Sequence, residues 1–373
     1  MQKFWFQEFE LRKLPALDAA RGFAAFWVFC FHFWGFFCEQ NFCSVPQIFA
    51  PFFRAGHLGV DIFFVLSGLL LFLSFAGKFE QNFWTTSKRF FARRFRRLFP
   101  LVAVFVTAVF ILKFEFRAEN FADFFAHLFF LQSLFFETYW GLNPVMWTLT
   151  VEFLFILILP ILFFLGRKSL KFFLGILGIL FLANFFYRFW IFQFFENWTT
   201  AERIFFSEQL WGRFDQFALG IFCGIAISHF SILIARFPRR NLIAKFATFF
   251  GAISAIFFAA IFANLNSAFR EIIFGQIFLH FLFAFSFAIF IGGMIFSDDF
   301  RGKKFFAPQL FAQFSKISFG FFLWHFPVLS ILKKVGADEL VGFFGGILIA
   351  IFLSIFSLFF VEKFFEKLLK SKF

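Results

Sequence analysis

The chain has 373 residues, of which 61% are hydrophobic and 15% are charged, and its formal net charge is +13. Soluble domains are only about 45–50% apolar, so this composition argues against a soluble protein and for a membrane protein. The surplus of basic residues flanks apolar runs, so it indicates contact with a membrane surface and not with nucleic acid. No group of cysteine and histidine residues has the spacing of a metal site, and no metal is predicted.

Apolar runs that could cross a bilayer recur along the chain. A helix of about 20 residues spans a hydrocarbon core of about 30 Å, and a helix satisfies its own backbone groups inside lipid. A further apolar segment, residues 121–136, contains Asp123 and His127 and is expected to lie along the interface or to re-enter the membrane. Residues 1–373 are predicted to be a single membrane domain with no appended soluble domain. We predict an all-α fold, a polytopic integral membrane bundle of about ten transmembrane helices, at residues 17–37, 56–76, 98–114, 145–165, 171–190, 214–235, 245–264, 274–296, 317–332 and 340–361.

The distribution of lysine and arginine predicts the orientation of these spans. If the N-terminus is cytoplasmic, 25 of the 35 basic residues fall in cytoplasmic segments, nine fall in the opposite loops, and Arg21 lies in the first span. Basic residues in short loops favour the cytoplasmic side. We therefore expect a multi-pass protein of the inner (plasma) membrane with both termini in the cytoplasm. Cys38 and Cys43 then lie in an outer loop, where they either form a disulfide or remain free thiols.

The first predicted span contains ionisable side chains in an otherwise apolar segment. Arg21 and His32 are eleven residues apart, so on a helix both face one side, about 16 Å apart along the axis. Asp18 lies one turn before Arg21 and can neutralise it. An ionisable group at membrane depth costs roughly 3 kcal/mol on insertion scales, which favours a functional site. The alternative is an arginine that reaches the interface and a histidine that packs through a hydrogen bond.

Polar residues recur in the second and third predicted spans. The second contains Asp61 and Ser67 within GHLGVDIFFVLSGLL, residues 56–70. A basic cluster, RFFARRFRRLFP at residues 89–100, precedes the third. Planar guanidinium groups can donate paired hydrogen bonds to phosphate, which favours a phosphate site. The alternative is that the cluster only marks the cytoplasmic side. The arginines of this cluster that we single out are Arg93, Arg94, Arg96 and Arg97.

Three later segments repeat this combination of apolar and ionisable residues. NPVMWTLTVEFLF contains Trp147 and places Glu152 in the fourth span, where a carboxylate requires a partner or a proton. WGRFDQFALGIFCG places Arg213 and Asp215 at the start of the sixth span, and FGFFLWHFPV places His325 in the ninth. For each carboxylate, a structural ion pair is the alternative to a functional role.

Taken together, these segments resemble the acyltransferase-3 family of integral membrane acyltransferases, and the resemblance extends from about Leu14 to Glu362. Five blocks match in the family's order. Phe155 and Phe322 occupy positions where the family has Tyr-like residues, which removes two hydroxyl groups. The matching residues are Asp18, Arg21 and His32; Gly59, Val60, Asp61, Phe63, Phe64, Ser67 and Gly68; Arg93, Arg94, Arg96, Arg97 and Pro100; Trp147 to Glu152; and Leu323, Trp324, His325 and Pro327.

The resemblance implies an acyltransferase that O-acetylates a cell-surface glycan or glycolipid, with acetyl-CoA as the acyl donor held by the arginine cluster. It implies that His32 acts as general base or nucleophile and that Arg21 pairs with donor phosphates or with developing negative charge. Glu152 or Asp61 would hold the other ring nitrogen of His32. Further substrate-binding or supporting roles are expected for Asp18, Ser67, Trp147, Arg213 and His325.

Two other functions fit the same residues. Buried arginine, histidine, aspartate and glutamate side chains equally suit a proton-coupled transporter or channel. A membrane protein that binds a partner without catalysis is the third possibility. Labelling of the protein by an acyl donor, or hydrolysis of that donor, would favour the enzyme, and ion currents without either would favour the transporter.

Overall fold

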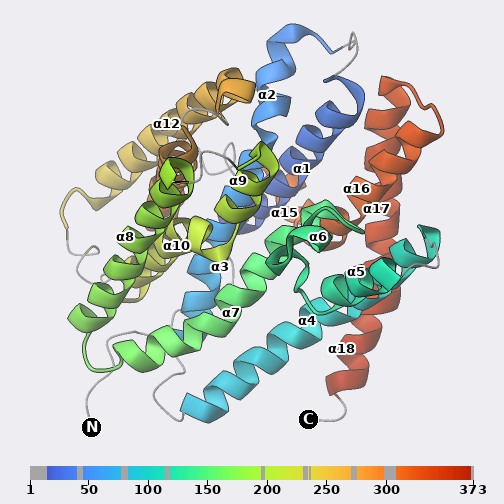
Figure 1. The fold of residues 1–373 in the computed structure, drawn as a ribbon. Helices are drawn as coiled ribbons and strands as arrows, with labels where there is room; N and C mark the ends of the chain where they lie inside the picture. The colour runs from blue at the N-terminus through green and yellow to red at the C-terminus, as the bar shows by residue number, and fades with distance from the viewer. Residues whose placement is uncertain are drawn as a thin grey trace.

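A computed structural model describes residues 15–39, 45–76, 83–113, 118–194, 198–229, 234, 237–269, 275–297 and 308–370. All regular secondary structure within these ranges is helical, which confirms the predicted all-α class (Figure 1). Helices occupy each of the ten segments predicted to cross the membrane. They are α1 (Pro15–Phe37), α3 (Gly59–Ala76), α4 (Phe83–Leu112), α7 (Trp147–Gly166), α8 (Leu170–Phe194), α10 (Leu210–His229), α12 (Arg240–Phe269), α13 (His280–Phe296), α16 (Ser318–Lys334) and α17 (Gly346–Ser357).

Eight helical stretches of the described residues are long and apolar enough to cross a membrane, as judged by length and composition, and the chain is thus a multi-pass membrane protein. Neither α1 nor α16 is among the eight, so the total of ten spans stays a prediction. The eight stretches are Gln47–Ala76, Phe83–Leu112, Pro144–Gly166, Leu170–Gln193, Thr200–His229, Arg240–Leu265, Ile277–Phe296 and Val341–Lys367.

Short helices connect the long ones and cover the ends of the bundle. The segment 121–136 is not a spanning helix, because α5 (Ala118–Leu128) has 11 residues and extends only about 16 Å. The other short α-helices are α2 (Ala50–Arg54), α6 (Phe136–Tyr139), α9 (Thr200–Ser207), α15 (Gln309–Phe314) and α18 (Lys363–Lys370). The 3-10 turns are Gln47–Phe49, Ala55–Leu58, Gln132–Leu134 and Pro144–Met146, and π-helical turns occupy Gly275–Leu279, Val341–Gly345 and Leu358–Glu362.

Helix α3 runs through the middle of the bundle and packs closely on α10. Gly68 faces the backbone of Phe217, and Gly220 faces the backbone of Val65, so a Cβ atom at either glycine would overlap the opposite helix. Small residues of this kind let membrane helices approach closely. The close approach brings the polar residues of α3 and α10 within contact distance of each other.

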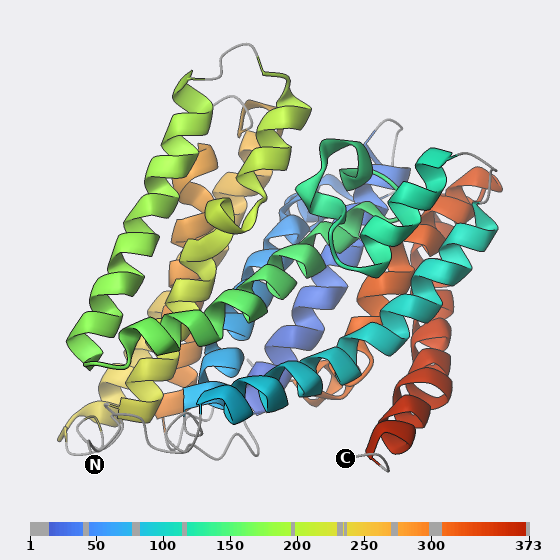
Figure 2. The same cartoon turned by 60° about the horizontal axis from the view of Figure 1, so that its bottom comes forward.

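The bundle has two distinct ends. The start of α1, the arginine-rich start of α4 and the end of α18 lie at the same end, at the bottom of Figure 2. At the other end, where α1 stops, Cys38 is disulfide-bonded, whereas Cys30 and Cys223 are free thiols. The predicted partner Cys43 lies outside the described residues. The chain therefore contains a disulfide at the end opposite to the arginine cluster.

Candidate active site

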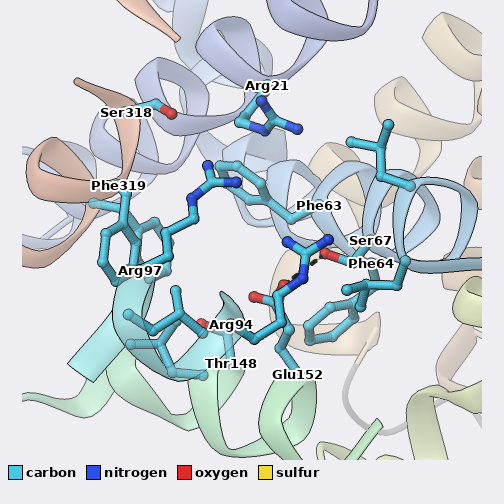
Figure 3. A pocket seen from close by; sticks show the side chains of 15 residues that line it. Arg21, Phe63, Phe64, Ser67, Arg94, Arg97, Thr148, Glu152, Ser318 and Phe319 are labelled. Carbon is cyan, nitrogen blue, oxygen red and sulfur yellow. Dashed lines mark hydrogen bonds between the residues drawn. The ribbon is translucent and has the colours of Figure 1, made fainter. Parts of the chain in front are cut away.

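A cavity of about 110 Å³ lies between α1, α3, α4, α7 and α16, at the arginine-rich end of the bundle. Three cations line it, Arg21 from α1 and Arg94 and Arg97 from α4, and their guanidinium groups converge on it (Figure 3). Ser67 of α3 and Glu152 of α7 form another part of its wall, and Ser67 Oγ donates a hydrogen bond of 3.0 Å to Glu152 Oε1. We name this space the arginine cavity. It is a positively charged site that contains one carboxylate.

The structure divides the predicted arginine cluster into two faces of α4. Arg94 and Arg97 are three residues apart and line the cavity together. Arg93 and Arg96 lie about 100° away around the helix, and neither lines the cavity. Arg96 Nε instead donates to the carbonyl oxygen of Ala92 at 3.1 Å, and the Arg93 side chain is exposed. Only two of the four predicted arginines therefore lie in one site.

Arg21 keeps the local partner that its spacing predicts. Its Nη1 lies 3.4 Å from Oδ1 of Asp18, one turn earlier on α1. The Asp18 side chain is 52% exposed, so water screens this ion pair strongly. Asp18 therefore supports Arg21 weakly and leaves its guanidinium available to the cavity.

His32 and His325 form a contacting pair between α1 and α16. His32 Nδ1 lies 2.9 Å from the carbonyl oxygen of Val28, and His325 Nδ1 lies 3.2 Å from that of Phe321. Because a carbonyl oxygen only accepts hydrogen bonds, each neutral ring carries its proton on Nδ1. His325 Nε2 then accepts from His32 Nδ1 at 3.2 Å. His32 Nε2 keeps its lone pair and has no partner among the described residues.

The expectation that Glu152 or Asp61 holds the other ring nitrogen of His32 is wrong. Glu152 accepts from Ser67 in the arginine cavity, and Asp61 accepts from other side chains deeper in the bundle. The Val28 carbonyl, four residues before His32 on the same helix, takes the expected role. A backbone carbonyl one turn away orients the ring without the cost of burying a carboxylate beside it.

Asp61 belongs to a buried polar network that joins α3, α10 and α13. Its Oδ2 lies 2.7 Å from His280 Nδ1, and its Oδ1 lies 3.5 Å from Arg213 Nη1. Arg213 also contacts Glu208 at 3.4 Å, and its guanidinium lies 5.7 Å from the centre of the Trp147 ring. Buried charges are tolerated when they are paired in this way, so these predicted site residues hold three helices together.

The network ends at His57 and Tyr139, which both contact Glu208. His57 Nε2 lies 3.3 Å from Glu208 Oε1, and the hydroxyl group of Tyr139 donates to Glu208. Burial, together with the negative charge of Glu208, raises the pKa of Tyr139 well above its ordinary value, so the hydroxyl group stays protonated and remains a donor. The network is therefore a chain of paired groups that extends from α13 to the short helix α6.

Sequence reasoning missed several members of these buried clusters. His57, Glu208 and His280 lie in the network, and Arg188 pairs with Asp215 at 2.7 Å. A signal existed, since each is an ionisable residue beside or inside an apolar run. Arg188 and Asp215 are 27 positions apart and His280 and Asp61 are 219 positions apart, so the sequence alone does not reveal these pairings.

Two phenylalanine rings separate the arginine cavity from the histidine pair. Phe322 lines the cavity, and its ring centre lies 5.7 Å from that of His325. Phe63 also lines the cavity and packs edge-on against Phe322 at 5.7 Å. We name Phe63 and Phe322 the phenylalanine partition. Because Phe322 borders the cavity and contacts His325, the direct path from the arginines to the histidine pair leads past this partition.

Beyond the partition, His32 lines a second pocket of about 310 Å³ at the disulfide-bearing end of the bundle. This outer pocket is lined by Phe31, His32, Trp34, Gly35, Phe36, Glu39, Arg54 and Phe326. A pocket of this size can hold a small ligand. The candidate active site thus has two compartments on either side of the bundle interior, a cationic cavity and an aromatic outer pocket, with His32 and His325 between them.

Sequence comparisons relate the chain to known proteins. A family model described as an acyltransferase domain matches residues 14–361 of the chain. The peptidoglycan O-acetyltransferase of Listeria monocytogenes is 24% identical over 341 residues, which cover 86% of this chain and 50% of that protein. An O-acetyltransferase of Staphylococcus aureus is 27% identical over 163 residues, which cover 40% of this chain and 24% of that protein. The chain thus spans half or less of the length of these relatives, and no solved structure matches it.

Proposed function

Since this chain belongs to the acyltransferase-3 family, we propose that it is a membrane acyltransferase that moves an acetyl group from acetyl-coenzyme A to a hydroxyl group of a cell-surface glycan or glycolipid. Two relatives are named O-acetyltransferases, and one of them is named for peptidoglycan, which supports an acetyl donor and a glycan acceptor. Membership in this family favours acyl transfer over the transporter or channel that the buried charges also suit.

The arginine cavity is the proposed donor site. Its volume of about 110 Å³ is well below the roughly 300–1,000 Å³ of pockets that enclose a drug-sized ligand, so only the acyl end of the donor fits inside. The phosphate groups then bind at the rim. Arg94 and Arg97 offer planar guanidinium groups there, which can donate paired hydrogen bonds to phosphate oxygens. Arg21, which lines the same cavity from α1, adds positive charge toward the thioester.

The state of the His32 ring is the observation that carries the proposal. Its Nδ1 is committed to Val28 and His325, so the Nε2 lone pair has no partner among the described residues, and His32 lines the outer pocket. A neutral imidazole with this tautomer can take the proton of an acceptor hydroxyl group. The hydroxyl oxygen then forms an ester bond with the acyl carbon, and the carbon–sulfur bond of the thioester breaks. The sulfur takes the proton that His32 accepted, so coenzyme A leaves as the thiol and the imidazole is neutral again. Attack by Nε2 itself, through an acyl-histidine, is the second route.

The two compartments suit a reaction across an inner (plasma) membrane. We place the arginine end and both termini in the cytoplasm, as the distribution of basic residues predicts. The disulfide at Cys38 supports an oxidising environment at the His32 end. In this orientation coenzyme A stays in the cytoplasm, and the acetyl group passes the phenylalanine partition to reach an acceptor outside.

The test is transfer by the detergent-purified protein from radiolabelled acetyl-coenzyme A to a panel of saccharides. His32→Ala should lower the rate per folded molecule by about 10²–10⁴-fold while donor binding persists. His229→Ala, at the far end of α10, is the matched control and should keep the wild-type rate. Acid quenching would separate the two routes, since only the acyl-histidine leaves label on the protein. Equal rates for His32→Ala and wild type would refute the assignment, and ion flux into liposomes without donor turnover would favour the transporter.

A further inference from the structure

The outer pocket contains a cation that the proposed reaction has not used. Arg54 is the last residue of the short helix α2, and its side chain lines the same pocket as His32. The guanidinium carbon lies 5.2 Å from the centre of the Trp34 ring, so an aromatic face supports the group from one side. Arg54 and His32 therefore line the same pocket.

Arg54 has no anionic partner among the residues that the structure describes. It makes no ion pair or hydrogen bond there, and its Nε is buried without an acceptor. The buried arginines Arg188 and Arg213 do have anionic partners. Arg188 contacts Asp215, and Arg213 contacts Asp61 and Glu208. A half-buried guanidinium without a counter-charge is costly, so an anion that enters the pocket would satisfy it.

The rest of the lining favours a saccharide with one such anion. Phe31, Trp34, Phe36 and Phe326 supply flat apolar faces, on which the C–H face of a sugar ring can pack. Among the described residues, Glu39 is the one carboxylate that lines the pocket. Glu39 is exposed, and its carboxylate oxygens lie more than 4 Å from the nitrogens of Arg54. Its charge is therefore hydrated at the rim, and it can accept hydrogen bonds from sugar hydroxyl groups.

We propose that the outer pocket is the acceptor site and that Arg54 binds a negatively charged group of the acceptor, placing a neighbouring hydroxyl group at His32 Nε2. This inference rests on the proposed acyl transfer and adds the class of its acceptor, an acidic saccharide. The anion is a carboxylate of the sugar or a phosphate that links the sugar to a lipid. Both present oxygens that the two-pronged donor set of Arg54 can bind.

Binding measured without any donor tests the inference separately from the reaction. The probes are a uronic acid oligosaccharide, the same oligosaccharide with its carboxyl groups reduced to alcohols, and a polyprenyl phosphate sugar in detergent micelles. Calorimetry should give tighter binding of an acidic probe than of the neutral one. Arg54→Ala should weaken binding of the acidic probe by about tenfold to a hundredfold and leave the neutral probe unchanged. Arg54→Lys should recover part of the loss.

Lys333→Ala is the matched control, because Lys333 Nζ also lies 5.2 Å from an aromatic ring, that of Phe37, but does not line the pocket. It should leave both affinities unchanged. Preference for the uronic acid would assign a sugar carboxylate, and preference for the polyprenyl phosphate sugar would assign a lipid phosphate. Equal affinity for acidic and neutral probes, or unchanged affinities in Arg54→Ala, would overturn the inference while leaving acyl transfer intact. So would an equal fall of kcat for acidic and neutral acceptors in that variant, which would indicate a role at the reacting carbonyl.

Discussion

Nε2 of His325 lies 3.2 Å from Nδ1 of His32, although the two residues are 293 positions apart in the chain. The Phe321 carbonyl binds His325 Nδ1, so His325 can offer only an acceptor to its neighbour. The proton of His32 is thereby held on Nδ1, between Val28 and His325. In this arrangement His325 orients the ring that we propose to be catalytic.

Replacement of His325 should therefore cost less activity than replacement of His32. His325→Ala removes one hydrogen bond while the Val28 carbonyl still holds His32 Nδ1, so we expect about a tenfold loss in kcat. His32→Ala should lose about 10²–10⁴-fold. Both rates are measured per folded molecule, after the folded fraction is determined by thermal unfolding. Losses of equal size would mean that both rings take part in the chemistry.

The division of the arginine cluster can be tested with two double variants of equal charge change. Arg94→Ala with Arg97→Ala removes two cations from the arginine cavity and should weaken coenzyme A binding about tenfold or more. Arg93→Ala with Arg96→Ala removes the same charge from the other face of α4 and should change the affinity far less. Calorimetry at two salt concentrations measures both, and higher salt should weaken the wild-type contact further. Similar losses in the two variants would show that only the overall charge matters.

The buried network predicts a large difference between two aspartates. Asp61→Asn removes the negative charge that pairs with Arg213 and replaces one of the two acceptor oxygens by an amide NH₂ group. Breaking a buried ion pair in this way costs about 3–5 kcal/mol. Asp18→Asn removes an exposed partner of Arg21 and should cost less than about 1 kcal/mol. Thermal unfolding in detergent should show a clear fall in the midpoint for the first variant only. A stable but inactive Asp61→Asn protein would instead point to a direct role in the reaction.

The phenylalanine partition predicts the size of acyl group that the protein accepts. Phe322→Val removes part of the barrier between the arginine cavity and His325, so longer acyl groups gain room. We expect the ratio of kcat/KM for a butyryl donor to that for an acetyl donor to rise about tenfold, since each methylene group is worth about 1–3 kcal/mol in such a pocket. Phe319→Val changes the same cavity away from His325 and is the control. An unchanged ratio in Phe322→Val would show that the acyl group takes another route.

The proposed orientation predicts which end of the bundle is accessible from outside the cell. Single cysteines at Glu137, in α6, and at Arg239, just before α12, differ in their predicted side. An impermeant maleimide added to whole cells should label the first position and not the second. Labelling of position 239 from outside would reverse the map and place the arginine cavity outside.

The sequence alone was sufficient for the class of fold and for most of the helices. Long apolar runs have to be helical in a membrane, because the backbone has no other hydrogen-bond partners there. Short-range relationships were also predictable. The ion pair of Asp18 with Arg21 follows from helical spacing, and the overlap of the spans with the ten predicted segments follows from their length.

The tertiary structure alone decided which ionisable groups meet. Several apolar helices can pack in many orders, and the abundance of phenylalanine, 88 residues, leaves apolar side chains on every helix face. Periodicity therefore cannot tell which face of α4 turns Arg94 and Arg97 inward, or that Asp61 lies beside His280 and not beside His32. Those contacts depend on close packing between distant segments, such as that of α3 on α10 through Gly68 and Gly220, and only the folded bundle brings them together.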